Sequence, residues 1–143
     1  GVPPVRNHQD AKFIAGKQAF YQAGCHSCHT PSFTLPENTE HPLMANQVIH
    51  PYTNLALHDM GTGLADGGTE EQANGKEWRT PPLWGIGLQQ KVTKHSGFLH
   101  DGRARTIEEA ILWHGGEAEK SQQKFKRLSN QQRQALLAFV SSI

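Results

Sequence analysis

The chain has 143 residues and carries 14 basic and 13 acidic side chains, so its formal charge at pH 7 is only +1. This length fits one domain, placed over residues 1–143. So small a charge gives no basic field to hold nucleic acid, and no run of about 18 apolar residues is present to span a membrane. With only two cysteines, three positions apart, a disulfide scaffold is excluded as well. The chain begins Gly-Val-Pro-Pro rather than with Met, so we expect a mature or excised chain.

The first predicted element is a helix over residues 10–24. Its larger side chains repeat at the i, i+4, i+7, i+8 spacing of one helical face, formed by Phe13, Lys17, Phe20 and Tyr21. Small Ala and Gly residues stand between them, and Gly24 is expected to end the helix.

The middle of the chain, from Thr30 to about Gln90, is broken by prolines and glycines, so long regular elements are not expected there. A connection of this length is unusual inside one domain, which suggests that the loops wrap around something other than each other. Its most polar part, residues 64–75, is predicted to be an exposed loop.

Two further helices have clear starting signals. Thr106 and Glu109 form the pattern of a capping box, and the helix that follows is expected to end at the glycine pair of residues 115–116. Ser129 and Gln132 repeat the device before a last helix, whose apolar face carries Leu136, Phe139 and Val140. The order of helix, long loop, short helix and helix makes the predicted fold mainly α.

The motif that indicates chemistry lies at residues 25–29, which read Cys-His-Ser-Cys-His, the C-x-x-C-H pattern of c-type haem attachment. Cys25 and Cys28 would form thioether links to the haem, and His29 would be the proximal ligand of its iron. A thioredoxin-like motif would need a preceding strand, and a structural zinc site would need a second pair of ligands. Neither context is present, so the sequence predicts one covalent haem c.

A six-coordinate iron needs a second axial ligand, for which the other histidines, Met44 and Met60 are candidates. His114 lies on the same helical stripe as the aliphatic residues Ile107, Ala110 and Ile111. A buried imidazole needs a polar partner, and iron would be one. The alternatives are a core histidine satisfied in another way and a histidine favoured by the negative end of its helix.

Met60 is the rival to His114, because a thioether ligand also suits haem iron and would raise its reduction potential. Its alternative role is ordinary packing. We predict His114 as the distal ligand, with Met60 as the alternative. The histidines in terminal or loop positions are expected to be solvated: His8, His41, His50, His58 and His95.

Three longer strings indicate a family. Residues 52–61 read Tyr-Thr-Asn-Leu-Ala-Leu-His-Asp-Met-Gly, residues 77–85 read Glu-Trp-Arg-Thr-Pro-Pro-Leu-Trp-Gly, and residues 99–116 begin with Leu-His-Asp-Gly-Arg. Together with the C-x-x-C-H motif, they resemble the C-terminal cytochrome domain of the bacterial di-haem thiol-oxidoreductase-like proteins, relatives of the di-haem cytochrome c peroxidases. This resemblance implies a cytochrome c-like helical domain whose long irregular loops wrap around one covalent haem.

The resemblance also has implications for ligation and function. In the peroxidase relatives, a ligand of the electron-transfer haem comes from the helix after His-Asp-Gly, commonly as Met and sometimes as Tyr, and His114 takes that place here. This implies a bis-His haem of lower potential. Full-length relatives contain a second C-x-x-C-H domain, so this chain resembles the electron-transfer half, working with a redox partner protein or a second haem domain. Haem c is attached outside the bacterial cytoplasm, which implies a periplasmic or exported protein.

The expected function is one-electron transfer, since a closed coordination sphere leaves no position for a substrate, and the domain alone is not expected to be an enzyme. The alternative is a haem peroxidase or other haem oxidoreductase with an exchangeable distal ligand. A haem-based gas sensor is a third possibility.

Further side chains are expected at the haem. Arg79 first, then Arg103 and Arg105, are expected at the propionates, and Trp84 and Trp113 are expected against the macrocycle or a helix interface.

Overall fold

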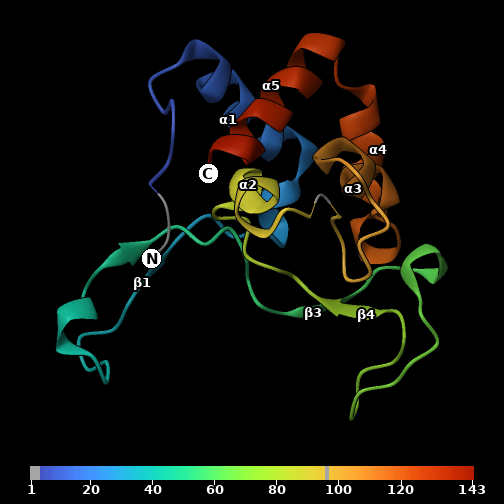
Figure 1. Ribbon diagram of the computed structural model, residues 1–143, viewed down its shortest axis with the longest axis horizontal. Coiled ribbons are helices and arrows are strands. Elements are labelled where there is room, and N and C mark those ends of the chain that lie inside the picture. Colours follow the sequence, from blue (N-terminus) through green and yellow to red (C-terminus); the bar gives the residue numbers. More distant parts are fainter. Residues whose placement is uncertain (1–3, 96) are drawn as a thin grey trace.

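The computed structural model describes residues 4–95 and 97–143 (Figure 1). Within them the α-helices are α1 (Ala11–Ala23), α2 (Gln89–Thr93), α3 (Ile107–Trp113), α4 (Glu119–Arg127) and α5 (Asn130–Ser142). The strands are short: β1 (Phe33–Thr34) pairs antiparallel with β2 (Val48–Ile49), and β3 (Leu57–Asp59) pairs antiparallel with β4 (Glu77–Arg79). The fold is therefore mainly α, as predicted. Among the described residues, no helix has the length and apolar character that crossing a membrane requires.

The core lies between α1 and α5, which pack against each other beside α4 (Figure 1). Phe20 and Phe139 are fully buried, and their ring centroids lie 5.4 Å apart. Tyr52, from the irregular middle of the chain, packs edge-on to both rings. The helices approach closely because α1 carries Gly16 at the contact, where a Cβ atom would overlap the carbonyl oxygen of Ala135.

The boundaries predicted for α1 are right, but its buried face is only partly right. Asp10 caps the first turn, and Gly24, with φ of 84°, ends the helix in the left-handed conformation. Phe20 is buried as expected, whereas Lys17 is exposed and Tyr21 keeps 41% of its surface exposed. The rest of the buried face consists of small residues, Gly16, Ala19 and Ala23. Close approach of α5 therefore selects small side chains where the periodicity suggested long ones.

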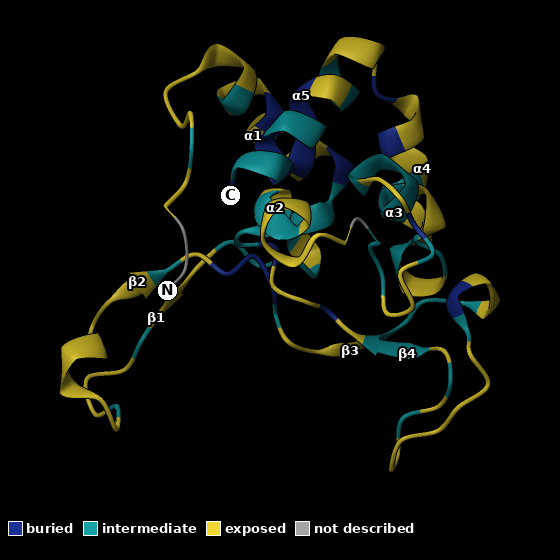
Figure 2. Cartoon of the chain, viewed as in Figure 1, coloured by how far each residue is buried: buried dark blue, intermediate teal, exposed yellow. Residues whose placement is uncertain are grey.

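The middle of the chain is irregular, as predicted. It leaves the helical body as two extended segments, one containing β1 and β2 and the other β3 and β4 (Figure 1). The β1–β2 arm is mostly exposed (Figure 2). Residues 64–75 form an exposed loop with one correction: Leu64 is only 2% exposed. Its carbonyl oxygen accepts a hydrogen bond from Nε1 of Trp78 at 3.0 Å, which fastens the loop to β4.

The capping box predicted for α5 is complete, with Ser129 and Gln132 exchanging hydrogen bonds. At α3 only half of the predicted box forms. The Thr106 hydroxyl accepts from the amide of Glu109 at 3.0 Å, but the Glu109 carboxylate accepts from the amide of Arg105, one residue further back.

Helix α4 was not predicted, and neither was the short helix α2. Phe125 is the only fully buried residue of α4, and the remaining positions are polar or charged. Such a helix has no apolar repeat for a sequence to reveal, and its packing against α1 and α3 stabilises it instead.

Candidate haem site

The C-x-x-C-H motif lies directly after α1, where Gly24 turns the chain into a 3-10 turn, Cys25–Ser27. The amide of His29 donates to the carbonyl oxygen of Cys25 at 2.9 Å, so the motif closes one further turn. Burial raises the pKa of Cys25 to about 11 and raises that of Cys28 as well. Both side chains are therefore neutral thiols at pH 7, carried on one turn with His29.

His29 is held as a neutral imidazole. Its Nδ1 lies 3.0 Å from the carbonyl oxygen of Tyr52, which can only accept, so Nδ1 carries the proton and Nε2 keeps its lone pair. Burial lowers the pKa of His29 to about 4 against the opposing effect of this hydrogen bond. The loop that presents the carbonyl is itself fixed, because the buried hydroxyl of Thr53 donates to the carbonyl oxygen of Thr80 at 2.6 Å.

His114 lies at the end of α3 rather than inside it. The helix ends at Trp113, so the expected termination at residues 115–116 is wrong, and His114 is the C-cap residue. Its Nδ1 lies 2.7 Å from the carbonyl oxygen of Ala110, one of the carbonyls that a helix leaves without a backbone partner. Nδ1 therefore carries the proton here too, and burial lowers the pKa of His114.

The rings of His29 and His114 lie close together, with centroids 6.5 Å apart and planes at 44°. No hydrogen bond within residues 4–95 and 97–143 uses Nε2 of either ring. Two metal–imidazole bonds of about 2.0–2.1 Å, with about 1 Å from each nitrogen to its ring centre, would separate the centroids by about 6 Å. A histidine whose Nδ1–H binds a backbone carbonyl is also typical of a metal ligand. These residues therefore fit an iron bound between them.

A pair that sequence reasoning missed connects β3 to the segment after His114. Nδ1 of His58 lies 2.8 Å from Oε2 of Glu117, and its Nε2 lies 3.1 Å from the side-chain amide of Asn54. Oε1 of Glu117 accepts from the amide of Asp59 at 3.0 Å. The expectation that His58 is solvated is therefore wrong, since only 17% of its side chain is exposed. No local pattern could reveal partners 59 positions apart.

The glycine pair of residues 115–116 allows the chain to lie in close contact with the backbone of residues 59–61. A Cβ atom on Gly116 would overlap the carbonyl oxygen of Asp59, and one on Gly115 would lie 2.9 Å from the carbonyl oxygen of Met60. Gly116 also has a φ of 52°. The chain leaving His114 thus lies directly on the backbone of residues 59–61, which includes Met60, the alternative ligand.

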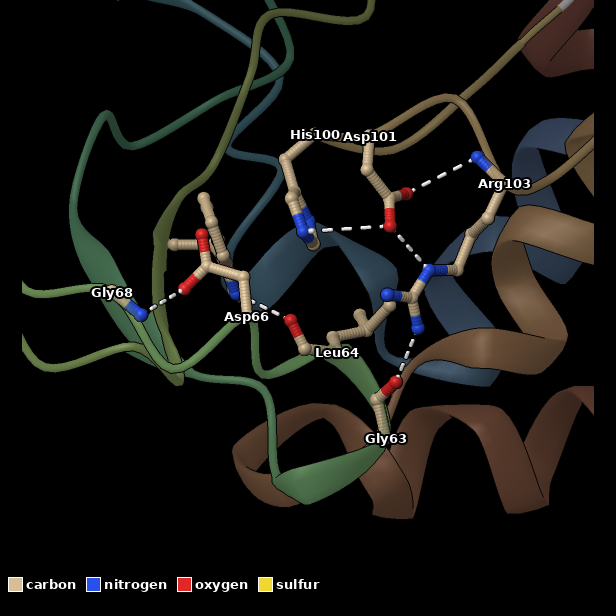
Figure 3. Close-up of polar contacts among 8 residues, drawn as sticks. Gly63, Leu64, Asp66, Gly68, His100, Asp101 and Arg103 are labelled. Atoms are coloured by element: carbon tan, nitrogen blue, oxygen red, sulfur yellow. Dashed lines mark hydrogen bonds and ion pairs between the residues drawn. The ribbon is translucent and has the colours of Figure 1, made fainter.

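Arg103, one of the arginines expected at a propionate, belongs to a local network (Figure 3). Its Nε donates to the Asp101 carboxylate at 2.6 Å, and its Nη1 donates to the carbonyl oxygen of Gly63. Its guanidinium also lies 5.0 Å from the ring centre of Trp113, the residue before His114. Arg103 therefore connects the loop at residues 62–64 to the end of α3.

The other side chains expected at the haem are arranged differently. Within the described part of the chain, the guanidinium of Arg79 on β4 makes no hydrogen bond or ion pair. Arg105 is 85% exposed and pairs with Glu109 at 3.2 Å. Trp84 is half-buried and follows the buried Leu83. Of these three, Arg79 is the one free to bind an added carboxylate.

Comparison with known proteins gives a family and a related fold. The family described as "Di-haem oxidoreductase, putative peroxidase" matches residues 1–143. No curated protein matches the chain. Among solved structures, hydrazine synthase of Kuenenia stuttgartiensis, studied under 20 bar of xenon, is similar with a TM-score of 0.56 and 21% sequence identity. The match covers 99% of this chain and 50% of that one, so the chain spans about half the length of this relative. At this identity the similarity shows the fold alone.

Proposed function

The chain belongs to the di-haem oxidoreductase family, and we propose that it transfers single electrons through one covalent c-type haem held between His29 and His114. The observation that supports this proposal most directly is the 6.5 Å separation of the two imidazole rings. Both rings are oriented through Nδ1 by backbone carbonyls, which leaves both Nε2 atoms able to bind iron.

The chain's own residues would divide the work of binding. Cys25 and Cys28 would hold the group covalently through sulfur, while His29 and His114 would supply neutral nitrogen ligands. When bound, the haem supplies the one-electron couple of iron(II) and iron(III). Because both imidazoles are buried and neutral, neither needs to lose a proton before it binds metal.

Two protein ligands would fill both axial positions, so substrate would have no position at the iron. This is why electron transfer is favoured over catalysis for this chain. The α1–α5 pair, the loops and α3 would then form one cytochrome c-like domain over residues 1–143, with Arg79 at a propionate and Trp84 against the macrocycle. The electrons would pass to a redox partner protein or a second haem domain, in the periplasm or after export.

A haem peroxidase with an exchangeable distal ligand is the second candidate, because the family description includes peroxidases. Optical spectra of the haem-loaded, oxidised protein distinguish the two. Low-spin iron that is unchanged by cyanide and by hydrogen peroxide supports electron transfer. High-spin iron that reacts promptly with peroxide supports the peroxidase and contradicts the proposal.

A further inference from the structure

Charge is concentrated on α4, one of the two helices that the sequence did not predict. It carries four of the 14 basic side chains and one of the 13 acidic ones, a net charge of +3. The remaining residues therefore sum to −2 although the whole chain is nearly neutral. The excess gives α4 a positive electrostatic potential, which is not apparent from the net charge of the whole chain.

Three of these cations share one exposed stripe. Lys120, Lys124 and Arg127 follow the i, i+4, i+7 spacing, and all three are exposed, whereas Phe125 is buried on the opposite side. None of the ion pairs among the described residues involves any of the three. The stripe is thus an unneutralised positive surface.

Helix stability does not account for the whole stripe. Cations in the last turn, such as Lys124 and Arg127, interact favourably with the negative end of the helix. Lys120 lies in the first turn, where that interaction is unfavourable, and it stands one turn from a like charge. The position of Lys120 is therefore not explained by the stability of α4.

The stripe lies beside the turn Cys25–Ser27, which would carry the covalently bound haem. Nζ of Lys124 lies 3.6 Å from the position that a Cβ atom would take on Gly24, the residue before Cys25. A hollow of about 260 Å³ opens at the same place, lined by Gln22, Lys124, Arg127, Leu128 and Gln132. Nε2 of Gln132 already donates to Oε1 of Gln22 at 3.2 Å, which leaves the two cations and the amide nitrogen of Gln22 as donors suited to a carboxylate.

We propose that the exposed stripe of α4 is the docking surface for the acidic face of a redox partner protein, with a partner carboxylate seated between Lys124 and Arg127. The proposal rests on the proposed electron-transfer function, since docking at this place would bring the partner next to the covalent attachment of the haem. A positive patch steers a protein with an acidic patch toward it.

The test compares Lys124→Glu with Lys12→Glu in the haem-loaded protein. Both change the charge equally at exposed helical positions, but Lys12 lies in the first turn of α1, at the opposite end from Cys25. Stopped-flow reduction by a plant-type ferredoxin, an acidic one-electron donor, is measured at about 0.01 M and about 1 M salt, where the Debye length is about 30 and 3 Å.

We expect Lys124→Glu to slow reduction at least about fivefold at low salt, Lys12→Glu to slow it less than about twofold, and both differences to vanish at high salt. Equal slowing by the two variants, or none, overturns the docking surface. Loss of binding by Lys124→Glu to phosphatidylglycerol vesicles, with unchanged reduction by ferredoxin, would assign the stripe to a membrane instead.

Photoreduced 5-deazariboflavin, an uncharged reductant, separates this proposal from the function on which it rests. It should reduce all three proteins at the same rate, because it needs no docking surface. If it reduces the native protein and ferredoxin does not, the docking surface is wrong and the electron-transfer function stands. If neither reduces the native protein, the proposed function itself fails.

Discussion

The imidazoles of His29 and His114 lie with their ring centroids 6.5 Å apart, although they stand 85 positions apart in the sequence and each is anchored by a different backbone carbonyl. One anchor, at Tyr52, belongs to the irregular middle of the chain, and the other, at Ala110, belongs to the last turn of α3. The pair therefore depends on how the loops pack on the helices, and neither element alone would produce it.

The first prediction concerns the distal ligand. His114→Ala should convert low-spin iron to a five-coordinate or water-bound form, because one nitrogen ligand is removed while His29 remains. Met60→Ala is the matched control and should keep the low-spin spectrum and the reduction potential. Optical and electron paramagnetic resonance spectra of the oxidised proteins measure the difference. The opposite pattern, with His114→Ala unchanged and Met60→Ala altered, would assign the ligand to Met60.

The second prediction concerns covalent attachment. A chain with both Cys25→Ala and Cys28→Ala should lose its haem on denaturing electrophoresis, because no thioether then holds it. Ser27→Ala changes an exposed residue of the same turn and should retain the haem. Haem staining of the gel, with the mass of the intact chain, measures attachment. Haem retained by the double variant would show that these thiols are not the attachment points.

The helices that could be predicted are those whose signals are local. Asp10 and Gly24 bound α1 as expected, and the box of Ser129 with Gln132 starts α5, because caps depend on residues a few positions apart. Helix α4 escaped prediction because Phe125 alone anchors it. Burial at a helix contact also depends on the partner, which is why Tyr21 was wrongly placed on the inner face of α1.

In the candidate site, too, some residues could be predicted from local patterns and others could not. The spacing of Cys25, Cys28 and His29 is a local pattern, and the helical stripe singles out His114 from the spacing of its neighbours alone. The hydrogen bond between His58 and Glu117 joins segments far apart in the sequence. It can form only when β3 packs against the segment after α3. Long-range polar pairs carry no periodicity, and a single sequence does not reveal them.

The third prediction concerns the pH dependence of the stability that the contact between His58 and Glu117 provides. The hydrogen bonds from His58 and from the amide of Asp59 hold the pKa of Glu117 below its ordinary value. A lowered pKa in the folded state contributes stability above the unfolded pKa of about 4.3, and this contribution disappears as the pH falls through the folded value. The melting temperature of the native protein should therefore exceed that of Glu117→Gln at pH 7, and the difference should shrink as the pH falls below about 4.3.

Glu119→Gln is the control for this measurement. Glu119 is exposed two positions away and takes part in none of the ion pairs among the described residues. Glu119→Gln loses only the interaction of a first-turn carboxylate with the positive end of α4, so its melting temperature at pH 7 should lie between those of the native protein and Glu117→Gln. If Glu117→Gln and Glu119→Gln behave alike, the carboxylate of Glu117 does not stabilise the contact between β3 and the segment after His114.

The last prediction concerns the glycine that lets this contact form. Gly116→Ala would place a Cβ atom on the carbonyl oxygen of Asp59 at a residue with a φ of 52°. We expect a loss of about 2–4 kcal/mol in the free energy of unfolding, because steric overlap adds to about 1–2 kcal/mol for the left-handed backbone. Gly67→Ala, at a φ of 76° with nothing within 4 Å of the new Cβ atom, isolates the backbone cost and should lose only about 1–2 kcal/mol.

Urea unfolding of the haem-loaded proteins measures both losses, and the haem spectrum adds a second readout. Because Gly116 lies two residues after His114, displacement of its backbone should also weaken distal ligation and introduce a high-spin component. Because Gly67 lies in the exposed loop of residues 64–75, Gly67→Ala should leave the spectrum unchanged. Equal losses of stability with two unaltered spectra would mean that the backbone contact at Asp59 neither stabilises the fold nor positions His114.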